Sequence, residues 1–210
     1  MNLIFNNQIS IFEDIFYKYL TPKQSTKLYT SNLILYNIYL INNKFEDNYF
    51  TPKDKIELIE AVHNWCKNRE EAILKYGDIN YWNTIYITNM NSLFYTEYNE
   101  YTGYTISYFN DNISDWNTSN VSNMTSMFIN ARNFNQDISN WDITNVQSIN
   151  YMFYSASNFN QNLNNWNIKN VKSINNIFTC AKKFNKENCS KWDLSNIKDI
   201  NKQYMFDIKL

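Results

Sequence analysis

Apolar residues recur with a period of about 25 along the C-terminal two thirds of the chain. The repeat is marked by five tryptophans, Trp82, Trp116, Trp141, Trp166 and Trp192. The last four tryptophans are 25, 25 and 26 residues apart. Apolar positions keep fixed distances from each of them, as Ile138, Ile143 and Val146 do around Trp141. A period in this range predicts a solenoid, in which each repeat packs only against its neighbours.

The apolar spacing inside one repeat changes from one half to the other. Ile138-x-x-Trp141-x-Ile143 has the LxxLxL spacing of a leucine-rich repeat, and the alternation of Trp141 and Ile143 predicts a short strand. Val146, Ile149 and Phe153 then follow helical spacing. We therefore expect an α/β repeat solenoid over 78–210, with about five leucine-rich-repeat-like coils, each of one short strand and one short α- or 3₁₀-helical turn.

The first repeat is longer than the others, because 34 residues separate Trp82 from Trp116. The extra residues lie near 95–104 and include four tyrosines. These are Tyr95, Tyr98, Tyr101 and Tyr104. Insertions in a solenoid fall in loops along one edge, and tyrosine offers contact area at low entropic cost. The insertion is either a recognition loop or a repeat that has drifted, and the sequence leaves both open.

Helical patterns precede the repeats. Residues 1–48 are predicted to form a helical N-terminal segment, and 49–77 a helical N-terminal cap of the solenoid. Thr51 and Pro52 have the composition of a helix start, and Gly77 is suited to a helix end. A solenoid needs such a cap because its terminal core would otherwise face water.

Composition and charge exclude several classes of function. The net charge is −1 with no basic cluster, which argues against nucleic acid as a partner. No apolar run is long enough to insert in a membrane, and the N-terminus lacks the features of a secretion signal. Three cysteines without a CxxC pair fit a reducing compartment, and Cys189 occupies an apolar position of the repeat. We therefore expect a cytoplasmic location, with a surface location as the alternative.

Residues for catalysis or for cofactor binding are scarce. The chain has two glycines and one histidine, His63, so neither a glycine-rich phosphate loop nor a multi-histidine metal site can form. We expect no enzyme activity, no cofactor and no metal. Asparagines that recur four residues after each of the last four tryptophans are expected to bond backbone groups of the coil. They are Asn120, Asn145, Asn170 and Asn196.

Small polar residues flank each buried tryptophan and are expected to point outward. These candidate partner-binding residues are Ser114, Asp115, Asn117, Ser139, Asn140, Asp142, Asn164, Asn165, Asn167, Ser190, Lys191 and Asp193. They would form a polar face that contacts a partner protein.

Two stretches resemble known families. Ile113 to Phe128 and Phe134 to Asp142 closely resemble the BspA-like leucine-rich repeats, also described as mycoplasma-lipoprotein-type repeats, over roughly 55–205. That resemblance implies a leucine-rich-repeat solenoid used in protein–protein or surface interactions, without enzyme activity. Residues 11–40 more weakly resemble an F-box, which implies docking to the linker protein of a ubiquitin ligase. The sequence thus favours a non-enzymatic interaction module, with an F-box substrate adaptor and a surface or adhesive repeat protein as alternatives.

Overall fold

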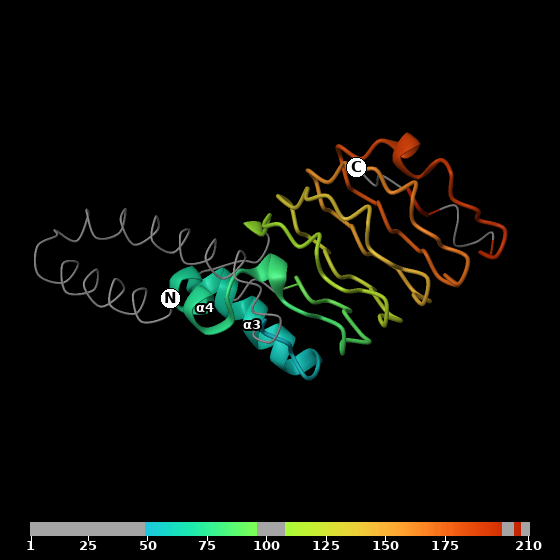
Figure 1. Ribbon diagram of the computed structural model, residues 1–210. Coiled ribbons are helices and arrows are strands. Elements are labelled where there is room, and N and C mark those ends of the chain that lie inside the picture. Colours follow the sequence, from blue (N-terminus) through green and yellow to red (C-terminus); the bar gives the residue numbers. More distant parts are fainter. Residues whose placement is uncertain (1–48, 96–107, 199–203, 207–210) are drawn as a thin grey trace, which may run out of the picture. The chain divides into compact units, whose positions relative to one another are not determined.

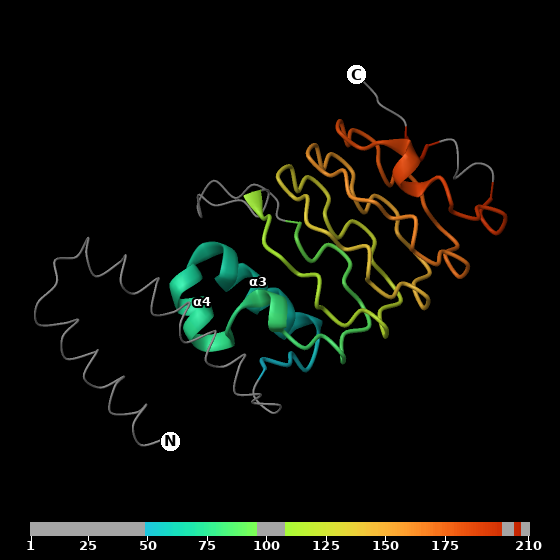
Figure 2. The same cartoon turned by 45° about the horizontal axis from the view of Figure 1, so that its top comes forward.

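The computed structural model describes residues 49–95, 108–198 and 204–206. All of them belong to one compact unit, Tyr49–Leu210. The helices that lie wholly within the described residues are α3 (Lys55–Lys67), α4 (Arg69–Tyr76) and two short 3₁₀ helices, η1 (Ile79–Tyr81) and η3 (Lys186–Cys189). After α4 the chain forms successive coils that lie side by side, green to red in Figure 1 and again in the turned view of Figure 2. The helices expected in 1–48 and the F-box-like stretch 11–40 lie outside the described residues.

Side chains of Asp54 and Asn68 fix the starts of the two α-helices. Asp54 accepts a hydrogen bond from the backbone N–H of Glu57 at 2.9 Å. The helix start expected at Thr51 therefore comes three residues later, because the carboxylate of Asp54 satisfies an otherwise unpaired N–H of the first turn. Asn68 ends α3 and caps α4. Gly77 ends α4 with a φ of 71°, which is a conformation that favours glycine.

The helices pack against the first coil through aromatic rings. The ring of Trp65 on α3 meets that of Trp82 edge to face, with 5.8 Å between centroids. Phe50 meets Trp82 in the same way at 5.2 Å. Asp111 adds a polar connection, since it accepts from the indole N–H of Trp65 at 3.1 Å and pairs with Arg69 at 2.7 Å. Helices and coils therefore share one core.

Backbone hydrogen bonds join each coil to the next. In one coil the N–H of every second residue donates to a carbonyl of the following coil. These bonds run from Met124, Ser126, Phe128 and Asn130 to Ser148, Asn150, Met152 and Tyr154, at 2.8–3.0 Å. The N–H groups between them close turns within the coil, as Met127 does to Met124. Isolated parallel bridges join Asn89, Asn123, Ser148 and Ser173 in succession.

The predicted α/β repeat solenoid is wrong, since the described residues contain no strand and no α-helix outside α3 and α4. The segment around Trp141, where a strand was expected, forms turns instead. The backbone N–H of Trp141 donates to the carbonyl of Ile138 at 3.1 Å. The expected return helix is the segment that pairs with neighbouring coils instead. Tyr151 and Ser155 have φ values of 56° and 57° there, and residues in this left-handed region interrupt an α-helix.

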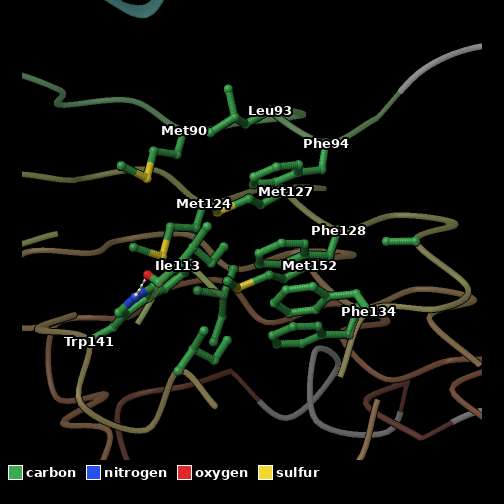
Figure 3. Close-up of a cluster of buried hydrophobic side chains, with 14 of the residues drawn as sticks. Met90, Leu93, Phe94, Ile113, Met124, Met127, Phe128, Phe134, Trp141 and Met152 are labelled. Atoms are coloured by element: carbon green, nitrogen blue, oxygen red, sulfur yellow. Dashed lines mark hydrogen bonds between the residues drawn. The ribbon is translucent and has the colours of Figure 1, made fainter. Parts of the chain in front are cut away.

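Two columns of phenylalanine rings fill the interior of the coils. One column contains Phe94, Phe128, Phe153 and Phe178, whose successive centroids are 5.1, 5.6 and 5.7 Å apart. The other contains Phe109, Phe134, Phe159 and Phe184, spaced by 5.9–6.0 Å. Figure 3 shows Phe128 and Phe134, one from each column, face to face. The period of the sequence thus becomes a continuous core that no single coil could form.

The tryptophans connect neighbouring coils through their indole N–H groups. Trp141 donates to the carbonyl of Ile113 in the preceding coil at 3.1 Å, shown as a dashed line in Figure 3. Equivalent bonds run from Trp116 to Ile79, from Trp166 to Ile138 and from Trp192 to Leu163, at 2.7–3.0 Å. Every one of these tryptophans is buried. The indole is therefore a second donor to a carbonyl that already closes a turn in the preceding coil, as the carbonyl of Ile113 does with the backbone N–H of Trp116 at 3.3 Å.

Replacing Trp141 with Phe should lower the free energy of unfolding by about 2–4 kcal/mol, because it removes the bond to Ile113 and leaves a smaller ring in the core. Urea denaturation followed by circular dichroism measures this. Tyr151→Phe is the control: the hydroxyl of the exposed Tyr151 makes no hydrogen bond to the described residues, so the change should stay within about 0.5 kcal/mol. An equally small effect of Trp141→Phe would contradict the role of the indole.

Cys66 and Cys189 should react slowly with iodoacetamide at pH 8 in the folded chain. Burial raises the pKa of Cys66 to about 12 and that of Cys189 to about 11, so the reactive thiolate is rare. Unfolding restores an ordinary thiol pKa, and both residues should then be labelled quickly. Mass spectrometry of the labelled peptides measures the rates. Labelling of both thiols at the same rate before and after unfolding would show that they are not buried.

Candidate interaction surface

The twelve polar residues expected to bind a partner occupy three positions around each buried tryptophan. The positions one before and one after the tryptophan are exposed in every repeat from Trp116 on. The position two before is half-buried at Ser114, Ser139 and Asn164 and exposed at Ser190. The residues are thus brought to the same part of successive coils, although the backbone that carries them forms turns.

Residues directly after the tryptophans hold these turns. Asp142 accepts from the N–H of Thr144 at 2.9 Å, and Asn117 accepts from that of Ser119 at 3.1 Å. The side chains of Asn167 and Asp193 likewise accept from the backbone N–H two residues later, at 3.2 and 2.9 Å. Hydrogen bonds of this kind fix the local backbone. A side chain here both shapes the surface and lies on it.

The position two before the tryptophan is structural in at least one coil. Asn164 donates to the carbonyl of Glu187 at 2.8 Å and accepts from the N–H of Lys191 at 2.9 Å. Both partners belong to the following coil. Asn164 is therefore a cross-coil bridge, and its availability to a partner protein is reduced accordingly.

Residues directly before the tryptophans are the most available. Asn140 and Asn165 are exposed and make no side-chain hydrogen bond to the described residues. The same position holds Tyr81 in the first coil, Asp115 in the second and Lys191 in the last. The surface therefore changes from aromatic and acidic, through neutral amides, to basic along the stack.

The asparagines four residues after the tryptophans have the structural role predicted for them. Asn145 donates its side-chain amide to the carbonyl of Ser119 at 2.7 Å, and Asn170 donates to Thr144 at 2.8 Å. Asn120 and Asn196 make the equivalent bonds. Each bond crosses to the preceding coil, whereas the sequence suggested bonds to the bends of the asparagine's own coil.

A second asparagine ladder lies just after the phenylalanines of one core column. Asn110 accepts from the N–H of Asn135, Asn135 from that of Asn160, and Asn160 from that of Asn185, at 2.8–2.9 Å. Amides therefore join the coils at two separate edges.

The described surface has two hollows of note. One of about 350 Å³ is lined by Tyr49, Tyr81, Trp82, Asn83, Asp115 and Asn117. Tyr81 and Asn83 flank Trp82 as the predicted residues flank the later tryptophans, so the same register applied to the first repeat would have found them. Tyr49 precedes the repeats and carries no periodic signal. The second hollow, of about 520 Å³, is polar and includes Lys169 and Lys172.

The tyrosine-rich insertion is described only in part. Tyr95 is half-buried at its start, whereas Tyr98, Tyr101 and Tyr104 lie outside the described residues. Among the described residues, no three histidine, cysteine or acidic side chains are grouped so that they could hold a metal ion. Within the same ranges, no helix combines the length and apolarity needed to cross a bilayer.

Comparison with known proteins gives one family. Residues 99–209 match the family described as Mycoplasma protein of unknown function, DUF285. This match agrees with the mycoplasma-type part of the resemblance and bears on neither leucine-rich repeats nor an F-box. No curated protein and no solved structure matches the chain.

The two kinds of exposed asparagine should differ in their effect on stability. Asn145→Ala removes the cross-coil bond to Ser119 and should cost about 0.5–1.5 kcal/mol. Asn140→Ala removes the same amide from the same repeat without breaking a described bond, so its effect should stay within about 0.5 kcal/mol. Paired denaturation curves measure both. Equal effects would show that the amide of Asn145 does not connect the coils.

Proposed function

Because the chain belongs to the Mycoplasma family of unknown function DUF285, for which no activity is described, we propose a function from its surface: it is a non-enzymatic protein–protein interaction module. The observation that carries this proposal is the row of exposed polar side chains directly before the buried tryptophans. Asn140 and Asn165 repeat there at the spacing of the coils, and their amides are not used by the described residues.

Rigid backbone behind this row favours binding. Trp141 and Trp166 are buried on one side of the row, and Asp142 and Asn167 hold the turns on the other. A surface ordered before binding loses little conformational entropy when a partner docks. The exposed amides can then both donate to and accept from a partner's backbone or polar side chains.

The chemistry of the row favours a protein partner. Lys191 is the one basic side chain among the twelve predicted positions, which does not suit a polyanion. Amide and hydroxyl groups provide adaptable hydrogen bonding in protein interfaces, and exposed tyrosines such as Tyr81 provide contact area. An interaction module in the cytoplasm is consistent with these features.

Capture experiments with the full chain test the proposal. We expect a partner protein from the source cell to be retained by the wild type and lost with the double variant Asn140→Arg/Asn165→Arg, because two large cations then occupy the row. The melting temperature of the variant should match the wild type, since neither amide holds the fold.

The control variant is Asn133→Arg/Asn158→Arg, which makes the same changes in the same two repeats, eight residues before each tryptophan. It should retain the partner. Equal retention by all three proteins, or equal loss from both variants, would contradict the assignment of the row as the binding surface.

A further inference from the structure

The hollow beside the first two coils combines aromatic rings with a carboxylate. The rings of Tyr49 and Tyr81 lie 6.1 Å apart between centroids, with 36° between their planes. Both side chains are exposed, Tyr49 at 46% and Tyr81 at 36%. Asp115 borders the same hollow from the next coil. A site of about 350 Å³ is thus lined by two electron-rich rings and one carboxylate.

A buried amide holds Asp115 in place. Asn80, which is 7% exposed, donates its side-chain N–H to Asp115 Oδ2 at 2.7 Å and accepts from the backbone N–H of Asp115 at 3.3 Å. Asn80 is itself positioned by Asp78, whose carboxylate accepts from the Asn80 backbone N–H at 2.9 Å. Asp115 Oδ1 receives only a long bond of 3.4 Å from Ser114. The carboxylate is therefore oriented from inside and leaves one oxygen for a ligand.

The electrostatic environment of the hollow is negative. Burial raises the pKa of the Tyr81 phenol, and the charges of Asp78 and Asp115 raise it further. The phenol is neutral, and the face of a neutral tyrosine ring attracts a cation. No basic side chain is present among the residues that line this hollow. Nothing in the described chain neutralises the charge of Asp115.

Two amides complete the edge of the hollow. The side-chain oxygens of Asn83 and Asn117 accept from the N–H groups of Ile85 and Ser119, at 3.2 and 3.1 Å. Their amide N–H groups make no bond to the described residues and remain available as donors. Donors at this position suit the backbone carbonyls of an extended peptide segment.

We propose that the hollow formed by Tyr49, Tyr81 and Asp115 binds an arginine side chain of the partner protein. The planar guanidinium stacks on tyrosine rings and pairs with a carboxylate, which are the two features that the hollow offers together. The amides of Asn83 and Asn117 hold the backbone on either side of that arginine. This inference rests on the proposed function, because the arginine belongs to a protein that docks on the coils.

A short peptide tests the site without the partner. The probe is acetyl-Ser-Arg-Ser-amide, and its comparison is the same peptide with citrulline, which has a similar shape and no charge. Titration is followed by NMR of the full chain. We expect the backbone amide signals of Asn83, Asp115 and Asn117 to shift with the arginine peptide. The citrulline peptide should bind at least roughly fivefold more weakly, because cation–π and charge pairing are both lost.

Variants assign the contacts. Asp115→Asn keeps the size of the side chain and should lower the affinity for the arginine peptide by roughly fivefold to tenfold. Tyr81→Ala should weaken it as well. Asp137→Asn, the same change at an exposed residue of the next coil that does not line the hollow, should leave the affinity unaltered. Equal binding of both peptides, no effect of Asp115→Asn, or a neutral glycoside that shifts the same signals when the arginine peptide does not, would overturn the assignment.

The peptide and capture experiments can fail separately. Loss of peptide binding in Asp115→Asn with no partner captured by the row of Asn140 and Asn165 would support the arginine site and contradict the proposed row. Partner capture through the row with no peptide binding would support the row and overturn the arginine site.

Discussion

Hydrogen bonds between coils are the interaction on which the structure depends. A single coil closes short turns within itself but leaves every second N–H of the segment from Met124 to Asn130 unpaired. Those groups find partners only in the following coil, and buried backbone groups without partners are costly. The carbonyl of Ser119, in turn, is satisfied by the side chain of Asn145, and the carbonyl of Ile113, which also closes a turn with Trp116, accepts the indole N–H of Trp141. Each coil therefore exchanges hydrogen bonds with both of its neighbours.

The same requirement divides the polar residues between structure and recognition. Asparagines that repeat at Asn145 and Asn170 are exposed, yet their amides are used between coils. Asn140 and Asn165 are exposed as well, but their amides make no hydrogen bond to the described residues. Exposure alone therefore does not identify a binding residue. The distinction between a used and an unused amide is what supports the proposed surface.

Buried threonines show how the first coils adapt the common pattern. Where later repeats have Ile143 and Ile168, the first two have Thr84 and Thr118. Their hydroxyls donate to the carbonyls of Asn117 and Asp142 in the next coil, at 2.8 and 3.0 Å. The bond from Thr84 connects the first two coils at Asn117, which lines the proposed arginine site, and the bond from Thr118 connects the second coil to the third. The bond between Thr84 and Asn117, together with that between Asn80 and Asp115, fixes the register of these two coils.

Periodicity in the sequence predicted the core well and the backbone poorly. Buried positions such as Trp141 and Val146 recur at a fixed spacing in the sequence. That spacing identifies them as core positions whether the backbone between them forms strands, helices or turns. The strand and helix were wrong because alternation around Trp141 also arises from turns. Ser126 and Tyr151 have positive φ values, and these residue types, unlike glycine, do not indicate a positive φ in a sequence. The hollow near Tyr81 could not be predicted from the repeat pattern, because Tyr49 lies outside the repeats.

Hydrogen exchange of the indole N–H groups tests the central claim most directly. If the bonds between coils hold the stack, the indole protons of Trp116, Trp141, Trp166 and Trp192 should exchange only when the whole stack of coils unfolds. NMR of the full chain in D₂O, at several low urea concentrations, measures their rates. All four should exchange slowly without urea, and their rates should rise with urea along one common slope. Rapid exchange of these protons in the native state would contradict the account.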